Sequence, residues 1–149
     1  MKAALHLAGP DDLGALTSLA RTFHTEEGAD MTDEDRDAGL RPLVEGIPHG
    51  AAYLIGPARA PIGYIVVTFA WSVQRGGMEG YIDEIYLRPA VRSRGIATEV
   101  VQTLGKVLSG AGVTTLHVRV DFQNEKARRL YARNGFEPDD RRAFLSREF

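Results

Sequence analysis

The stretch YIDEIYLRPAVRSRGIAT, residues 81–98, decides the fold of this chain. It reads as an apolar strand, a proline stop at Pro89, and a basic turn that opens onto an amphipathic helix. The first N–H groups of such a helix have no intrahelical acceptor and lie at the positive end of the helix dipole. Arg92 and Arg94 add positive charge, and Gly95 lets the backbone approach a ligand closely. The turn therefore suits a phosphate or pyrophosphate.

Apolar periodicity in the rest of the chain predicts an α/β domain with a mixed sheet. Strands are expected over residues 3–8, 51–55, 62–73, 81–87 and 114–120, with a last strand over 142–147, and helices over 13–23, 96–109 and 124–134. A polar turn is expected over 24–30, followed by a helix from Thr32, with acids in its first turn, to about Gly46. No repeat or linker divides the sequence, so residues 1–149 are expected to form one domain.

Two connections fix how the central strands pair. The turn Gln74-Arg75-Gly76-Gly77 predicts an antiparallel hairpin between the strands over 62–73 and 81–87. The strand over 81–87, the helix over 96–109 and the strand over 114–120 form a βαβ unit, so those two strands should be parallel.

Composition excludes several classes of function. A formal net charge of −2 argues against a general nucleic-acid or membrane binder. No apolar run approaches the roughly 20 residues of a membrane helix and no signal-peptide pattern is present, so the cytoplasm is the expected compartment. The chain has no cysteine, which excludes disulfides and thiolate chemistry. The four histidines are far apart in the sequence, so no metal site is expected; they are His6, His24, His49 and His117.

The basic turn is not a nucleotide-binding loop of the two best-known kinds. Residues 92–97, Arg-Ser-Arg-Gly-Ile-Ala, lack the second glycine and the Lys-Ser/Thr pair of a P-loop. They also lack the three glycines of the dinucleotide fingerprint. They do resemble the acyl-CoA pyrophosphate loop of the GNAT family of N-acetyltransferases: Arg or Gln, two residues, Gly, one residue, then Gly or Ala. The departures are Ala97 in place of the commoner glycine and Ser93-Arg94 where glycine often follows the arginine.

A second half-motif of the family follows downstream. A strand ending in Val118-Arg119-Val120 leads to Asn124, and then to Ala127, Leu130-Tyr131 and Asn134-Gly135-Phe136. The resemblance implies a GNAT-like acyl-CoA N-acyltransferase fold and acetyl-CoA as cosubstrate, with no metal. It implies a cofactor site formed by Ile85, Leu87, Arg92, Ser93, Arg94, Gly95, Ile96, Ala97, Thr98, Asn124 and Tyr131. Tyr131 would protonate the departing thiolate. Without the family, Asn124 is explained as a helix N-cap and Tyr131 as half-buried packing.

Two adjacent carboxylates, Asp83 and Glu84, lie where the family carries its general base. The spacing of Ile82 and Ile85 is irregular for a strand, which predicts a β-bulge near residues 83–84; the alternative is a strand buried on both faces. A carboxylate can accept the proton of an alkyl ammonium as the amine attacks a thioester. Glu84 is favoured over Asp83. The alternative is a carboxylate at the rim of the site, paired with Arg75 or Arg88.

The sequence gives less information about which residues bind the acceptor amine. It offers aromatic and acidic side chains, namely Phe23, His24, Glu26, Glu27, Trp71 and Tyr81. Together they would suit a cationic amine. Equally, the acids over 26–37 fit a solvated helix face, and His24 fits a surface or hydrogen-bonded histidine better than a catalyst.

These observations predict an acetyl-CoA-dependent N-acetyltransferase that transfers the acetyl group directly, in a ternary complex, to a primary amine of a small molecule. A protein lysine or N-terminal acetyltransferase uses the same chemistry and stays open. So does a non-catalytic acyl-CoA sensor, and so does a phosphate-ligand binder unrelated to CoA. A homodimer is compatible with this prediction.

Overall fold

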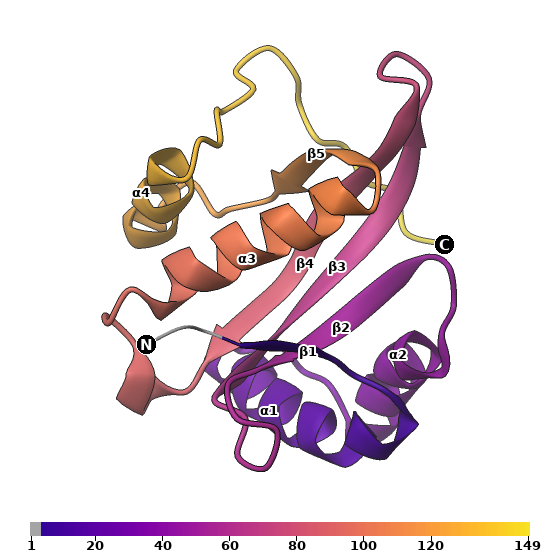
Figure 1. Cartoon of the computed structure of the whole chain (residues 1–149), viewed down its shortest axis with the longest axis vertical. Helices are drawn as coiled ribbons and strands as arrows, with labels where there is room; N and C mark the ends of the chain where they lie inside the picture. Colours follow the sequence, from indigo (N-terminus) through magenta and orange to yellow (C-terminus); the bar gives the residue numbers. More distant parts are fainter. Residues whose placement is uncertain (1–3) are drawn as a thin grey trace. The chain divides into compact units, whose positions relative to one another are not determined.

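The computed structural model describes residues 4–149, and five strands in this part of the chain form one sheet (Figure 1). They lie in chain order across it: β1 (Leu5–Leu7), β2 (Gly50–Ile55), β3 (Gly63–Ser72), β4 (Gly77–Leu87) and β5 (Val113–Val118). The first four pair antiparallel, and β5 pairs parallel with β4. The expected hairpin, βαβ unit and mixed sheet are confirmed; Ala3, at the start of the first expected strand, lies outside the described residues.

The helices are α1 (Leu13–Glu26), α2 (Asp33–Glu45), α3 (Ile96–Gly110) and α4 (Glu125–Arg133), with short 3₁₀ turns η1 (Pro10–Asp12) and η2 (Pro89–Val91). The prediction for α1 was wrong at its end, because residues 24–26 are helical rather than a polar turn. His24 follows Ala20 by four residues and continues the buried stripe of the helix by one turn. The polar residues of this last helical turn resemble a loop in the sequence.

The sheet separates two apolar layers (Figure 1). On one face, α1 and α2 pack with Tyr64, Val66 and Tyr86 in a cluster of buried side chains. The opposite face carries Ile65 and Val67, since successive side chains of a strand point to opposite faces. A side chain added at Gly80 of β4 would meet Val67 of β3 and Leu108 of α3, which places α3 on this second face.

Helix α2 begins and ends where the sequence predicts. Thr32 is its N-cap: the Thr32 hydroxyl accepts from the Asp35 N–H at 3.1 Å, and the Asp35 carboxylate accepts from the Thr32 N–H at 3.1 Å. Gly46 ends the helix with a φ of 96°, a left-handed conformation that favours glycine. This reciprocal cap fixes the first turn of α2, which carries Arg36.

The chain divides into two units, the first reaching to Arg119 and the second running from Val120 to Phe149. The second unit contains α4, as predicted, but the strand expected over 142–147 is absent from this described segment. That expectation was wrong. Phe144 and Leu145 are 72% and 89% exposed, so the segment buries no apolar face of the kind that stabilises a strand. No helix within residues 4–149 combines the length and apolarity needed to cross a membrane.

Candidate active site

The predicted bulge in β4 is present at Asp83. Glu84 pairs with Val66 and Ile82 pairs with Val67, so Asp83 has no partner on β3. The extra residue returns Ile82 to the face that carries Ile85, which explains their irregular spacing in the sequence.

The bulge also lies where β4 leaves β5. The last parallel pair joins Ile82 to Val118, and β4 continues for five more residues to Leu87 with no partner on β5. A strand edge without a partner presents unpaired backbone N–H and C=O groups. In the described structure, residues 84–87 therefore form an open strand edge directly before the basic turn.

Glu84 lies on the face covered by α1 and is held by two hydrogen-bonding partners. The Tyr64 hydroxyl of β3 donates to Glu84 Oε1 at 2.7 Å. His24 Nε2 of α1 lies 2.7 Å from Glu84 Oε2. The Glu84 side chain keeps 25% of its exposure, so the carboxylate is fixed on both oxygens and still reaches solvent.

The contacts of Glu84 continue into α2. The Nε of Arg36 donates to His24 Nδ1 at 3.1 Å. The Nη1 of Arg36 donates to Asp33 at 2.7 Å, and its Nη2 donates to the Met31 carbonyl at 3.1 Å. Arg36 and His24 are 5% and 6% exposed. One chain of hydrogen bonds thus joins α2, α1, β4 and β3.

Asp83 is in a different environment. Its carboxylate is half-exposed and lies 3.9 Å from the Arg119 guanidinium. Burial of part of the side chain and the charge of Glu84 raise the pKa of Asp83, against the opposing effect of Arg119. The alternative of a rim carboxylate paired with Arg75 or Arg88 was wrong: Arg75 pairs with Glu79, and Arg88 Nε donates to the Pro61 carbonyl.

The basic turn, residues 92–97, meets α3 in an open conformation. Ser93 and Gly95 have φ values of 63° and 76°, and a Cβ added at Gly95 would meet nothing within 4 Å. The Glu99 N–H donates to the Gly95 carbonyl at 3.2 Å. The N–H groups of Ile96, Ala97 and Thr98 precede that bond and are the orphan donors of the helix.

Arg92 fastens this turn to α1 and β4. Its guanidinium donates to both Glu26 oxygens at 2.9 and 3.0 Å and to the Leu87 carbonyl at 2.9 Å. It also lies 5.5 Å from the centre of the Tyr86 ring. The positive charge of Arg92 is therefore shared with a carboxylate of α1, whereas Arg94 is exposed.

Asn124 and Tyr131 belong to the second unit. Asn124 is the N-cap of α4, and its side chain accepts from the Ala127 N–H at 3.1 Å. Tyr131 is buried, and its ring lies 5.2 Å from the Phe136 ring in an edge contact. Burial raises the pKa of Tyr131 to about 12.

The expected acceptor-side residues fall into three places. Phe23 packs in the core beside Tyr64 and Tyr86, at ring distances of 6.3 and 5.8 Å. Tyr81 of β4 stacks on His117 of β5 at 4.8 Å, and both bond to the Glu79 carboxylate. Trp71 and Glu27 are exposed.

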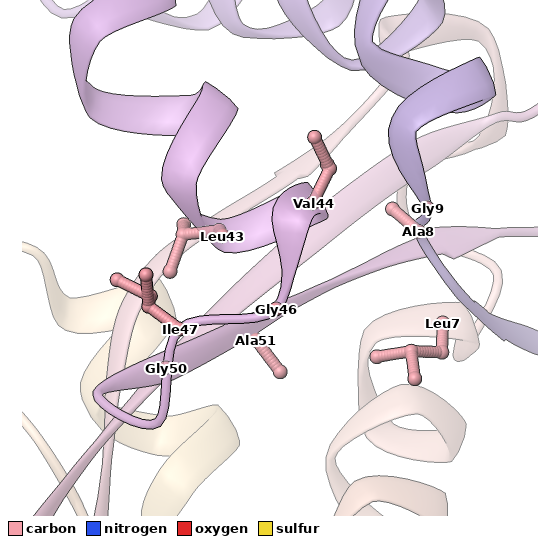
Figure 2. Close-up of a pocket in the computed structure, with 9 residues that line it drawn as sticks. All are labelled: Leu7, Ala8, Gly9, Leu43, Val44, Gly46, Ile47, Gly50 and Ala51. Atoms are coloured by element: carbon pink, nitrogen blue, oxygen red, sulfur yellow. The ribbon is translucent and has the colours of Figure 1, made fainter.

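A separate cavity of about 340 Å³ lies where the end of α2 meets β1 and β2 (Figure 2). Its lining has no ionisable or hydroxyl side chain: Leu7, Ala8, Gly9, Leu43, Val44, Gly46, Ile47, Gly50 and Ala51. No side chain in this lining can donate or accept a proton at neutral pH.

Sequence reasoning missed Tyr64 and Arg36, and it set His24 aside. A signal was present: His24 lies four residues after Ala20, and Arg36 four before Leu40, on the buried stripes of α1 and α2. A polar side chain on such a stripe is buried and needs a hydrogen-bonding partner.

Comparisons with known proteins agree with this fold. A solved integron cassette protein from the mobile metagenome of Cole Harbour Salt Marsh is 26% identical, with a TM-score of 0.83 over 97% of this chain and 89% of that chain. Ribosomal-protein-alanine N-acetyltransferase from Brucella melitensis biovar Abortus 2308 is 17% identical, with a TM-score of 0.79 over 99% of each chain. The protein AAC(6')-Iy, solved in complex with the bisubstrate analogue CoA-S-monomethyl-acetylneamine, is 14% identical, with a TM-score of 0.82 over all of both chains.

No protein with a curated description matches the sequence. The sequence model of the acetyltransferase (GNAT) family matches residues 15–136, which is most of the chain. The chain therefore belongs to the GNAT family of acetyltransferases.

Proposed function

We propose that this protein is an acetyl-CoA-dependent N-acetyltransferase that acetylates a primary amine of a small molecule by direct transfer in a ternary complex. The observation that carries the proposal is the bulge at Asp83. It lies where pairing with β5 ends, since β5 stops at Val118 opposite Ile82, so residues 84–87 have no partner there; Glu84 lies on the opposite side of the sheet from α3. An open strand edge for an acyl-CoA and a fixed carboxylate for an amine thus meet at one point of β4. We also propose that the two units act as one acetyltransferase domain, since the family match includes residues of both.

The basic turn fits the pyrophosphate of acetyl-CoA. The first N–H groups of α3, those of Ile96, Ala97 and Thr98, have no intrahelical acceptor. Gly95 precedes them in a left-handed conformation and has no side chain to block an anion from reaching them. Arg94 adds an exposed positive charge. The backbone of Ile85 and Leu87, and Asn124 by resemblance to the family, would hold the pantetheine arm. When bound, acetyl-CoA supplies a thioester with a transferable acetyl group.

Glu84 is the proposed proton acceptor. An alkyl ammonium, with a pKa near 10.4, is almost wholly protonated at neutral pH and cannot attack a carbonyl carbon. Glu84 accepts a proton from the ammonium, directly or through one water, and the neutral amine then becomes the nucleophile. Tyr64 and His24 each occupy one position on the carboxylate, and the exposed part of the side chain leaves room for a third contact.

Tyr131 is the proposed proton donor to the departing thiolate, by resemblance to the family. Because burial raises its pKa to about 12, its hydroxyl keeps the proton at neutral pH. A general acid must hold its proton until the leaving group needs it, and the raised pKa meets this requirement.

The acceptor is proposed to be cationic. Glu84 offers a partly exposed carboxylate, and the stacked pair Tyr81–His117 adds an aromatic surface on β4 and β5. Such surroundings attract an ammonium group.

Free thiol measurement tests the proposal, because a chain without cysteine contributes no background. The protein is incubated with acetyl-CoA and polyamines, amino acids, aminoglycosides or short peptides, and released CoA is followed with a chromogenic reagent. Amine-dependent release with a small amine is expected. Release with peptides alone indicates a protein acetyltransferase, and acetyl-CoA binding without release across the panel indicates a sensor. Failure of acetyl-CoA to outcompete free nucleotides contradicts the cofactor assignment.

A further inference from the structure

We propose that His24 is a positioning residue that holds the Glu84 carboxylate through a fixed tautomer and does not itself carry the proton. The inference rests on the proposed role of Glu84 as proton acceptor. It assigns His24, Arg36 and Tyr64 a shared task in that step: they set the orientation of the carboxylate before an amine arrives.

Arg36 determines which nitrogen of His24 holds the proton. The arginine side chain has five N–H donors and no acceptor, and it does not lose its proton in proteins. The Nε of Arg36 lies 3.1 Å from His24 Nδ1, so Nδ1 is the acceptor and carries no hydrogen. The single ring proton is then on Nε2, which donates to Glu84 Oε2 at 2.7 Å.

Two charged groups face the imidazole, and the one at Nδ1, Arg36, opposes a second ring proton. The Arg36 guanidinium of α2 faces one nitrogen, and the Glu84 carboxylate of β4 faces the other. Asp33 balances the charge of Arg36, and Tyr64 of β3 contacts Glu84 on its second oxygen. A second ring proton would place an N–H against the Nε–H of Arg36 and a cation against a cation, both in a buried position.

The same geometry excludes His24 as a proton relay. Glu84 cannot pass a proton inward, because Nε2 already carries one and Nδ1 is occupied by Arg36. Tyr64 donates its own proton to Oε1. The proton taken from the amine must therefore leave through the exposed part of Glu84. What the network supplies is orientation, since donors on both oxygens oppose rotation of the carboxylate.

Two substitutions separate positioning from proton transfer. In His24→Gln the side-chain amide can donate to Glu84 and accept from Arg36 but cannot titrate, so kcat is expected to stay within about threefold of wild type. In His24→Leu the donor is lost, and kcat is expected to fall about 10- to 100-fold with the KM for acetyl-CoA unchanged.

Thr22→Ala is the matched control on the same helix. The Thr22 hydroxyl donates to the Ser18 carbonyl on an exposed face, and its loss should leave both constants unchanged. If His24→Gln is as slow as His24→Leu while both bind acetyl-CoA normally, the imidazole carries the proton and the inference is wrong. Full activity of His24→Leu also overturns it.

Nitrogen NMR of the imidazole gives a test that needs no substrate. With ¹⁵N-histidine, His24 should show a protonated Nε2 and a bare Nδ1 at neutral pH. An imidazolium signal at neutral pH contradicts the inference even if the wild type is active. A wild type that binds acetyl-CoA and keeps this tautomer but acetylates no amine contradicts the proposed function instead.

Discussion

At the scale of single residues, the site depends on polar side chains buried at apolar positions. His24 and Arg36 occupy the inward stripes of α1 and α2, where an unpaired polar group would cost about 1–3 kcal/mol. Their contacts with Glu84 and Asp33 satisfy them. These buried polar residues are therefore the ones that link α1 and α2 to the Glu84 carboxylate.

Replacing each of the two carboxylates by its amide should distinguish them. Glu84→Gln is expected to lower kcat about 10²- to 10⁴-fold, the usual contribution of a general base, with the affinity for acetyl-CoA retained. Asp83→Asn, the matched change at the bulge, should lower kcat by less than about tenfold, because Asp83 is half-exposed and lies beside Arg119. Steady-state kinetics and isothermal titration measure both. The reverse order of effects would assign the proton acceptor to Asp83.

At the scale of elements, the proposed acyl-CoA site lies at the start of α3 and the bulge of β4. The basic turn needs a residue with φ near 76° at position 95, and glycine adopts it without strain. The space around Gly95 is open, so a Cβ added there meets nothing within 4 Å, and its cost to the fold is backbone strain.

Two substitutions at Gly95 test the turn. Gly95→Glu is expected to abolish acyl-CoA binding, since it places a side chain and a negative charge where the pyrophosphate would bind. Gly95→Asn is the control for backbone strain: asparagine tolerates the left-handed region and carries no charge, so most of the affinity should remain. Calorimetric titration with acetyl-CoA measures both. Unchanged affinity of Gly95→Glu would remove the basis for the loop assignment.

The cap of α2 provides a test of stability at the same scale. Thr32→Ala removes one side of the reciprocal cap and should lower the free energy of unfolding by about 1 kcal/mol. Thr25→Ala, which removes an exposed hydroxyl bonded to the Arg21 carbonyl within α1, should change it by less than about 0.5 kcal/mol. Urea denaturation of both variants measures the difference. Equal stability of the two would show that the cap does not stabilise α2.

At the scale of the whole molecule, both units bury tyrosine. Burial is the first cause that raises the pKa of each of the five tyrosines: Tyr53, Tyr64, Tyr81, Tyr86 and Tyr131. The folded chain thus favours the neutral phenol. Because the folded pKa exceeds the unfolded value, the stabilisation is fully present below about pH 10 and is lost as the pH rises through the folded pKa.

Stability is therefore expected to fall between about pH 10 and 12. Tyr131, whose pKa rises from 10.0 to about 12, accounts for up to about 3 kcal/mol of this loss. Tyr131→Phe should show a shallower decrease of the unfolding free energy over this range, measured by urea denaturation at several pH values. Tyr81→Phe, at a half-exposed position, should change the slope less. A slope unaffected by Tyr131→Phe would contradict the assignment.

The sequence by itself determined the order of elements, the βαβ unit, the bulge at residues 83–84 and the family, because each depends on local periodicity and on short motifs. It could not determine that His24 is buried: the polar residues after Phe23 resemble a turn, and the partners of His24, Glu84 of β4 and Arg36 of α2, are distant in the sequence. The sequence pattern also predicted a strand at 142–147 that does not form, since a strand needs a pairing partner and the local pattern does not show whether one is present.

Tertiary structure decided the contacts of Glu84. Tyr64 is 20 residues away in the sequence and His24 is 60, and no local pattern relates such positions. The antiparallel register of β3 and β4 aligns Tyr64 opposite Tyr86, and the inward face of α1 supplies His24. Sequence placed a carboxylate at the bulge, and long-range packing alone fixed the direction of that carboxylate.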